Sequence, residues 1–183
     1  KNPPKLLDFI NKNVHECDVY DEDILMLYSN SEINKLDEYI DHERDNLFTY
    51  AGMRQLCDKY LIQDRSETKI YETPQFAYMI IAMVCFGKYE GPARISYVKK
   101  AYDYFSRFKI NLPTPLMAGV RSKVRQYASC CLIDVDDTLP SIISSSTAAG
   151  YATGSRYGIG LNMGRIRPLN SPIRNGEVVH TGV

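Results

Sequence analysis

The first half of the chain carries apolar residues at helical spacing. Ser29 and Glu32 have the spacing of a capping box, and the apolar residues after them predict a helix that reaches residue 40. Thr73 before Pro74 marks a second helix start; the apolar run that follows predicts a buried helix ending at Gly87. Further helices are predicted for residues 6–10, 21–28, 47–60 and 95–108.

Two patterns interrupt these helices. A polar turn between apolar residues predicts a small hairpin near residues 60–71. Pro113 and Pro115 flank Thr114, and because each proline fixes a φ angle and removes a donor, Thr114 is expected in a rigid extended turn. Aromatic helices give way to Gly, Ser and Arg near Leu112. We therefore predict a helical region over 1–112 and a second region over 113–183.

The second region opens with a strand pattern. The short apolar run from Cys130 to Asp134 predicts a buried strand. Because strand side chains alternate between faces, Ser129 and Cys131 share one face and Cys130 emerges on the other. A disulfide between the neighbours Cys130 and Cys131 would be strained in this geometry. One of the two thiols is therefore expected to serve packing.

A helix is predicted from Leu139 to Gly154, with Asp137 or Thr138 as its N-cap. One face is apolar, and many of the remaining residues are serine or alanine. Such small side chains permit the close approach of another helix. The pattern fits packing inside the core or against a second copy of the chain, and leaves both open.

Composition narrows the class of protein. With 183 residues, of which 44% are hydrophobic, the chain can enclose a substantial core. Lys and Arg number 22, as do Asp and Glu, so no overall field favours nucleic acid or an anionic membrane. The longest apolar run has 11 residues, whereas a membrane span needs about 20. The five cysteines form no CxxC pair and no signal peptide opens the chain, which predicts a cytoplasmic protein with free thiols.

Several groups have both a chemical and a purely structural interpretation. Cys130 is either a small buried hydrophobe or a reactant. Asp134, Asp136 and Asp137 suit a metal or a ribose hydroxyl, but also suit a solvated helix start. The three histidines have no spacing for catalysis or metal binding, so no metal site is predicted.

The glycines and arginines near the end of the chain suggest an anionic ligand. Gly158, Gly160 and Gly164 lack the full GxGxxG spacing, which argues against a dinucleotide-binding loop. Arginine forks match phosphate oxygens, although a solvated basic face explains the same residues. The arginines concerned are Arg165, Arg167 and Arg174.

A series of short sequence blocks resembles one known family in the same order. The blocks are Asp41-His42-Glu43-Arg44-Asp45, Lys59-Tyr60-Leu61-Ile62-Gln63, Thr114-Pro115-Leu116-Met117-Ala118-Gly119-Val120-Arg121, Arg125-Gln126-Tyr127-Ala128-Ser129-Cys130, Gly158-Ile159-Gly160, Gly164-Arg165-Ile166-Arg167, Ser171-Pro172-Ile173-Arg174 and His180-Thr181-Gly182. Together they resemble the large, catalytic subunit of class I ribonucleotide reductases. The resemblance implies a mainly α N-terminal helical region that leads into the first strands of a ten-stranded α/β barrel, incomplete in this chain.

The resemblance also implies roles in catalysis. Cys130 matches one of two cysteines that deliver electrons to the substrate ribose and become a disulfide on turnover. Thr114, Ser129 and Gly158 match positions that hold the ribonucleoside diphosphate. The implied partners are a radical-generating, metal-containing small subunit and thioredoxin or glutaredoxin as the reductant.

Allosteric roles follow from the same resemblance. The helix over 139–153 resembles the family's dimer contact, which implies a homodimer. A deoxynucleoside triphosphate (dNTP) or ATP is the implied effector. Its matching positions are Asp137, Thr138, Leu139, Arg167, Ile173 and Arg174.

The chain departs from the family pattern at both ends. It begins after the place of the ATP-binding cone and ends before the second redox cysteine and the radical-bearing cysteine. We therefore expect an N-terminal portion of a large subunit that is inactive without the remainder and the small subunit. The alternative is a non-catalytic helical module that binds a nucleotide or a protein, in which Cys130 would not cycle between thiol and disulfide.

Overall fold

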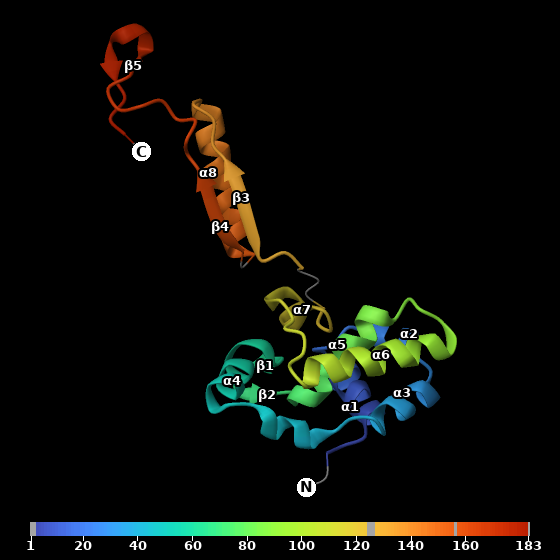
Figure 1. Ribbon diagram of the computed structural model, residues 1–183. Coiled ribbons are helices and arrows are strands. Elements are labelled where there is room, and N and C mark those ends of the chain that lie inside the picture. Colours follow the sequence, from blue (N-terminus) through green and yellow to red (C-terminus); the bar gives the residue numbers. More distant parts are fainter. Residues whose placement is uncertain (1–2, 124–126, 156, 183) are drawn as a thin grey trace. The chain divides into compact units, whose positions relative to one another are not determined.

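The computed structural model describes residues 3–123, 127–155 and 157–182 (Figure 1). The chain divides into two compact units, a helical unit (Lys1–Tyr127) and a strand unit (Ala128–Val183). Arg125 and Gln126, which belong to one of the family-like blocks, lie outside the described residues. Across the described ranges, the helices lack the length and apolar character needed to cross a membrane.

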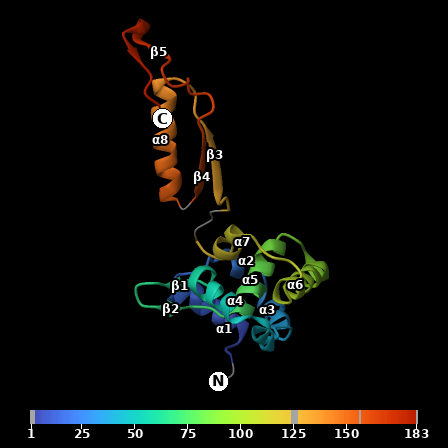
Figure 2. The same cartoon turned by 60° about the vertical axis from the view of Figure 1, so that its left-hand side comes forward.

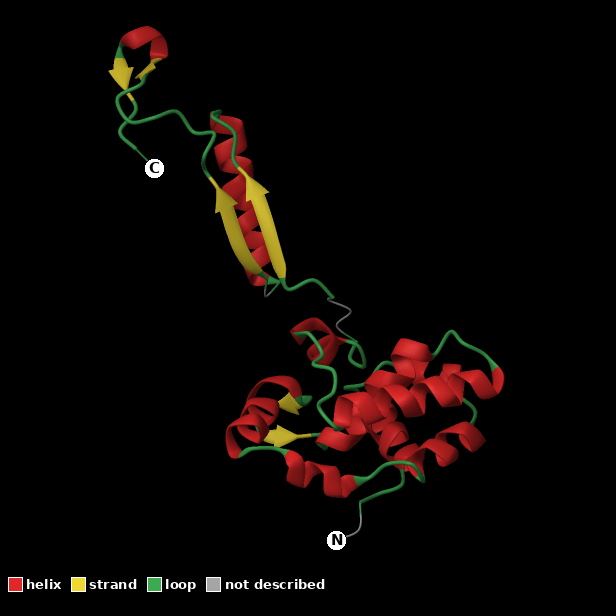
Figure 3. Ribbon diagram, in the orientation of Figure 1, coloured by secondary structure: helices red, strands yellow, loops and turns green. Residues whose placement is uncertain are grey.

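The helical unit consists mainly of α-helices (Figure 3). These are α1 (Leu6–Asn11), α2 (Asp23–Leu27), α3 (Asn30–Asp37), α4 (Tyr50–Gln55), α5 (Pro74–Phe86), α6 (Gly91–Ser106) and α7 (Thr114–Gly119). Shorter helical segments and a two-residue-strand hairpin connect them: η1 (Lys12–Glu16), η2 (His42–Leu47), η3 (Leu56–Tyr60), β1 (Gln63–Asp64) and β2 (Lys69–Ile70). The antiparallel pairing of β1 with β2 confirms the predicted hairpin.

Helix α5 forms the centre of the helical unit. The Thr73 hydroxyl accepts a hydrogen bond from the Phe76 N–H (3.4 Å), Pro74 is the first helical residue, and Gly87 is the C-cap. All residues from Pro74 to Met83 are buried, which confirms the predicted core helix. The capping box of α3 is confirmed as well, with the Ser29 N–H donating to Glu32 Oε2 (2.9 Å).

Helix α6 packs against α5, but it ends earlier than the sequence pattern predicts. Val98, Tyr102 and Phe105 are buried on the expected face. Phe108 lies beyond the last turn, with a φ of 56° and a partly exposed ring. The chain reverses there, so that the Lys109 N–H donates to the Tyr104 carbonyl (2.9 Å). The predicted inclusion of Phe108 in the helix was therefore wrong.

The predicted extended turn at Thr114 was also wrong. Pro113 is extended, with a ψ of 154°, and acts as the N-cap, whereas Thr114 and Pro115 form the first turn of α7. A proline is tolerated there because the first N–H groups of a helix have no intrahelical partner. Met117 and Val120 belong to the hydrophobic core. The helical unit consequently extends well past residue 112.

A buried ion pair joins distant segments of the helical unit. The Arg121 side chain is 0% exposed, and it donates to both carboxylate oxygens of Glu72, with Nε at 2.7 Å from Oε2. Tyr20 donates its hydroxyl to the same carboxylate (2.5 Å), as does the Ile62 N–H (2.7 Å). Although burial lowers the pKa of Arg121, the Glu72 carboxylate raises it above its usual value overall. Burial raises the pKa of the Tyr20 hydroxyl well above its ordinary range.

The strand unit is a strand–helix–strand motif followed by a small hairpin. Its elements are β3 (Cys130–Asp134), α8 (Leu139–Gly154), β4 (Gly158–Asn162), β5 (Pro172–Ile173), η4 (Arg174–Gly176) and β6 (Val178–Val179). Strands β3 and β4 pair in parallel, from Cys130 opposite Gly158 to Asp134 opposite Asn162. Helix α8 lies along one face of this pair, as both Figure 1 and Figure 2 show.

Side chains along β3 alternate as predicted. Cys131 and Ile133 are half-buried, whereas Cys130 and Leu132 are exposed, Leu132 to 88%. The prediction of a fully buried strand was wrong for the described residues, because α8 covers a single face of the pair. Thr138 is the N-cap of α8 and accepts a hydrogen bond from the Ser141 N–H (3.3 Å), as one of the two predicted alternatives requires.

Candidate functional site

Three predicted site residues meet where β3 and β4 begin. Cys130 lies opposite Gly158 in the parallel pair, and the Gly158 N–H donates to the Ser129 carbonyl (2.7 Å). The Ser129 hydroxyl lies 3.8 Å from the Cys130 sulfur. A Cβ on Gly158 would stand 3.7 Å from that sulfur, so the glycine leaves this side of the thiol open. The Cys130 thiol is therefore exposed at the first residue of β3.

The neighbouring thiol faces the other way. Cys131 is half-buried on the side of β3 that α8 covers, and both cysteines are free. The alternation rule therefore correctly predicted that one thiol is presented and the other packs.

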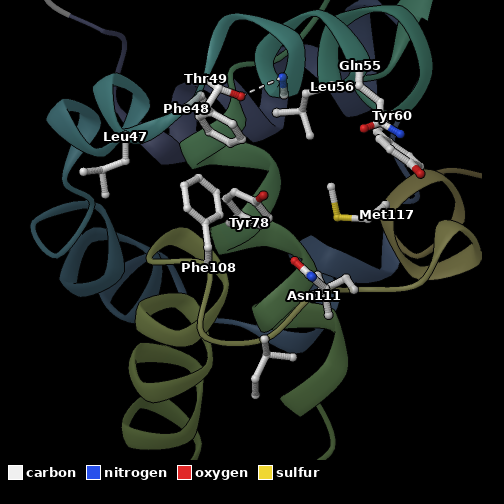
Figure 4. A pocket seen from close by; sticks show the side chains of 13 residues that line it. Leu47, Phe48, Thr49, Gln55, Leu56, Tyr60, Tyr78, Phe108, Asn111 and Met117 are labelled. Atoms are coloured by element: carbon white, nitrogen blue, oxygen red, sulfur yellow. Dashed lines mark hydrogen bonds between the residues drawn. The ribbon is translucent and has the colours of Figure 1, made fainter.

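Thr114, the remaining predicted substrate residue, belongs to the helical unit. Its hydroxyl oxygen lies 3.2 Å from the Tyr60 hydroxyl. Tyr60 lines a hollow of about 450 Å³, in which the rings of Phe48, Tyr78 and Phe108 gather (Figure 4). Burial raises the pKa of Tyr78 to about 12. Sequence reasoning missed this hollow, because its lining comes from segments far apart in the chain.

The structure brings two predicted effector residues into contact. The Arg167 Nε lies 3.0 and 2.7 Å from the two carboxylate oxygens of Asp137. The side chains are 35% and 34% exposed, so the pair is open to solvent on one side. The hydrogen bond from Arg167 lowers the pKa of Asp137. The start of α8 and the segment after β4 therefore converge.

A second arginine pairs with the other carboxylates at this end of the strands. Arg165 lies 2.9 Å from Asp136 and 3.5 Å from Asp134, and Asp134 also accepts a hydrogen bond from the Asn162 amide (2.8 Å). Hydrogen bonding to Asp136 raises the pKa of Arg165. No cluster of three or more His, Cys, Asp or Glu suited to a metal ion occurs in the described residues. These carboxylates bind guanidinium groups instead.

The remaining predicted effector residues follow the two members of this pair along the chain. Thr138 and Leu139 begin α8, and Leu139 is exposed. The carbonyl before Ile173 accepts a long hydrogen bond from Arg167 (3.4 Å). Arg174 has a φ of 51° and forms no ion pair with any residue that the structure describes.

Two further predictions concern the strand unit. Residues Gly158–Asn162 form strand β4, so Gly158 and Gly160 lie in a strand and not in a loop. Helix α8 exposes Leu139, Ile143 and Tyr151 at intervals of four and eight residues, whereas Ser145 is buried. This exposed apolar stripe suits a contact with another helix.

Comparison with known proteins places both units in one family. Residues 46–125 match the family model described as ribonucleotide reductase, all-alpha domain, and residues 128–183 match the model described as ribonucleotide reductase, barrel domain. The two matches meet close to the division between the helical unit and the strand unit.

Individual relatives agree with these models. The chain is 48% identical over 180 residues to ribonucleoside-diphosphate reductase 1 subunit alpha of Escherichia coli (strain K12), which covers 98% of this chain. It is 46% identical to the subunit alpha of Haemophilus influenzae and 44% identical to that of Enterobacteria phage T4, each over 181 residues and 99% of this chain. The chain spans 24% of the length of each of these three relatives.

These matches confirm the predicted fold class, a mainly helical N-terminal region followed by the start of a barrel, with the sheet still open in this chain. The chain belongs to the family of ribonucleotide reductase large subunits, with residues 46–125 matching the all-alpha domain and residues 128–183 the barrel domain.

Proposed function

We propose that this chain is part of a ribonucleoside-diphosphate reductase large subunit and supplies one redox cysteine, part of the substrate site and part of an allosteric site. The observation that carries the proposal is the exposed Cys130 thiol beside Gly158, in a chain 48% identical to a reductase subunit alpha. The cytoplasm is the expected compartment, because its reducing conditions keep thiols such as Cys130 free.

The chemistry assigns a definite role to the thiol. Reduction replaces the 2′-hydroxyl of the ribose with hydrogen, and the hydroxyl leaves as water. The two electrons come from a pair of thiols that become a disulfide. Cys130 is one of the pair, and the other belongs to the remainder of the large subunit. A radical from a metal-containing small subunit starts the reaction, and thioredoxin or glutaredoxin restores the thiols.

The residues around Cys130 fit substrate binding. Ser129 offers a hydroxyl beside the thiol, and Gly158 leaves room for a ribose because it has no side chain. In the helical unit, Thr114 is a further substrate residue that the family resemblance implies, and its hydroxyl oxygen lies 3.2 Å from the Tyr60 hydroxyl. Hydroxyl groups both donate and accept hydrogen bonds, so these residues suit a ribonucleoside diphosphate.

The Asp137–Arg167 pair is the proposed centre of the effector site. A carboxylate accepts hydrogen bonds from ribose hydroxyls, and a guanidinium donates to phosphate oxygens. A dNTP or ATP would therefore replace the contact between Asp137 and Arg167 with contacts of its own. Four further residues complete the proposed site. Thr138 and Leu139 directly follow Asp137, and Ile173 and Arg174 come shortly after Arg167. Helix α8 is the proposed homodimer contact, supported by its exposed apolar stripe.

Arg167→Ala should weaken effector binding by about ten- to a hundredfold. Charge-assisted hydrogen bonds contribute about 1.5–3 kcal/mol, which corresponds to that range of affinity. Calorimetry on the assembled enzyme would measure dNTP affinity, and light scattering would show whether the effector still promotes dimerisation. Arg165→Ala is the matched control, because Arg165 carries the same charge but is 60% exposed and is not one of the proposed effector residues, so its loss should change the affinity by less than about threefold. Unchanged affinity in Arg167→Ala would mean that this arginine is only a surface group.

The proposed function as a whole can be tested by reconstitution. The chain alone should not reduce a ribonucleoside diphosphate, and activity should arise when the remaining part of a large subunit and a radical-generating small subunit are added. Deoxyribonucleotide formation would be measured with thioredoxin as the reductant. Turnover by the isolated chain, or no activity in the complete mixture, would contradict the proposal.

A further inference from the structure

A second group of cations lies in the helical unit, far in sequence from the proposed effector site. A hollow of about 340 Å³ is lined by Lys99 and Lys100 on α6, by the C-cap residue Arg107 and by Lys109 just after it. Tyr39 and Tyr104 complete its wall. We refer to it as the α6 hollow. The whole chain carries equal numbers of acidic and basic residues, so four cations around one hollow are a marked local excess.

The single carboxylate in this hollow does not balance these cations. Asp103 binds the buried Arg44 (2.7 Å) and accepts a hydrogen bond from the Tyr39 hydroxyl (2.7 Å). Asp103 also forms an ion pair with Arg107 at 3.8 Å, so this one carboxylate is shared between Arg44 and a cation of the hollow. The net positive charge of the α6 hollow therefore remains available to an external anion.

The chain path explains how the cations come together. Lys99, Asp103 and Arg107 are four residues apart, so they follow one another along one side of α6. The left-handed turn at Phe108 brings the chain back, and the Lys109 N–H binds the Tyr104 carbonyl (2.9 Å). Stabilisation of the helix end explains Arg107 and Lys109, but Lys99 and Lys100 lie more than a turn before the end of α6 and beyond the reach of this effect.

The tyrosine rings hold the lysines rather than a ligand. The Lys99 ammonium lies 4.7 Å from the centre of the Tyr39 ring, and the ammonium groups of Lys100 and Lys109 both lie 5.9 Å from the centre of the Tyr104 ring. Such cation–π contacts restrain the flexible side chains. Because ammonium groups already face both rings, little ring surface is left for a nucleotide base to stack on.

From this geometry we propose that the α6 hollow binds polyphosphate, as a site separate from the proposed effector site. Several fixed cations around a hollow of this size match the several negative charges of a triphosphate. Since the rings are covered by the lysines, the site recognises the phosphate chain and not the base. Inorganic triphosphate and the triphosphate group of a nucleotide are the two sources of this chemistry.

The test uses the full chain carrying Arg167→Ala, so that binding at the proposed effector site is weakened. Calorimetry with inorganic triphosphate at low salt should show binding, and the further substitutions Lys99→Met and Lys109→Met together should weaken it at least tenfold. The control pair Lys35→Met and Lys88→Met removes the same charge from exposed positions outside the α6 hollow and should change the affinity by less than twofold. ATP should bind as tightly as inorganic triphosphate.

Three outcomes would overturn the proposal. Absence of triphosphate binding would mean that these cations only keep the surface soluble and stabilise the C-terminal end of α6. Equal losses in the two lysine pairs would indicate a diffuse electrostatic effect without a site. A clear preference for ATP over inorganic triphosphate would indicate recognition of the base, contrary to the arrangement of the rings.

Discussion

Replacing Arg121 with methionine should lower the free energy of unfolding of the helical unit by about 3–5 kcal/mol, because it leaves a buried carboxylate without its partner. Glu72 is buried together with Arg121, and its oxygens also bind the Tyr20 hydroxyl and the Ile62 N–H. These neutral donors cannot balance a full charge. The substitution therefore leaves the buried carboxylate with only the Tyr20 hydroxyl and the Ile62 N–H as donors, and it also removes the bonds from Arg121 to the Met117 and Tyr60 carbonyls.

Urea unfolding followed by circular dichroism would measure this loss. Arg54→Ala is the matched control: Arg54 pairs with Asp58 at 3.1 Å, but its side chain is 60% exposed, and exposed pairs contribute about 0–1 kcal/mol. Glu72→Gln should cost about as much as Arg121→Met, and the double substitution should cost less than the sum. A loss below 1 kcal/mol for Arg121→Met would contradict the role of the pair.

Cys130→Ser should abolish repeated turnover in a reconstituted reductase, because serine cannot supply electrons or form a disulfide. This expectation depends on the exposed position of Cys130 at the start of β3. Deoxyribonucleotide formation would be followed with thioredoxin as the reductant. The same experiment separates the reductase from a non-catalytic helical module, in which the loss of this thiol would have no effect on ligand or partner binding.

Cys131→Ser provides the matched control one residue away. Its side chain packs on the α8 side of the strand, so the change should cost mainly stability, about 1–3 kcal/mol for a polar group in a packed site. Thermal unfolding would measure this cost, and turnover per folded molecule should be retained. Equal catalytic losses in the two variants would refute the assignment of Cys130 as the presented thiol.

Local signals predicted much of the fold. The capping residues Ser29 and Thr73 correctly marked helix starts, and the period-two rule correctly separated Cys130 from Cys131. Local rules failed where two of them compete. A residue before proline usually prefers an extended conformation, but proline is also tolerated in the first turn of a helix. Thr114 follows the second rule, because it begins α7 and Pro115 is the next helical residue.

Features that depend on chain reversal were beyond these rules. The reversal at Phe108 uses a left-handed conformation that glycine or asparagine usually marks, so the sequence contained no signal for it. The α6 hollow depends on this turn, and the buried pair of Glu72 and Arg121 joins residues 49 positions apart. The contact between Asp137 and Arg167 was anticipated because family resemblance, and not spacing, connected the two residues.

The two-stranded sheet of β3 and β4 has a consequence for synthesis of the protein. The described strands leave both outer edges of this pair unpaired and expose Leu132 to 88%. Open edges and exposed apolar side chains invite pairing with other chains. The helical unit encloses its own core before β3 leaves the ribosome, so it can fold first. The strand unit then remains vulnerable to aggregation, and to capture by chaperones, until further strands cover it.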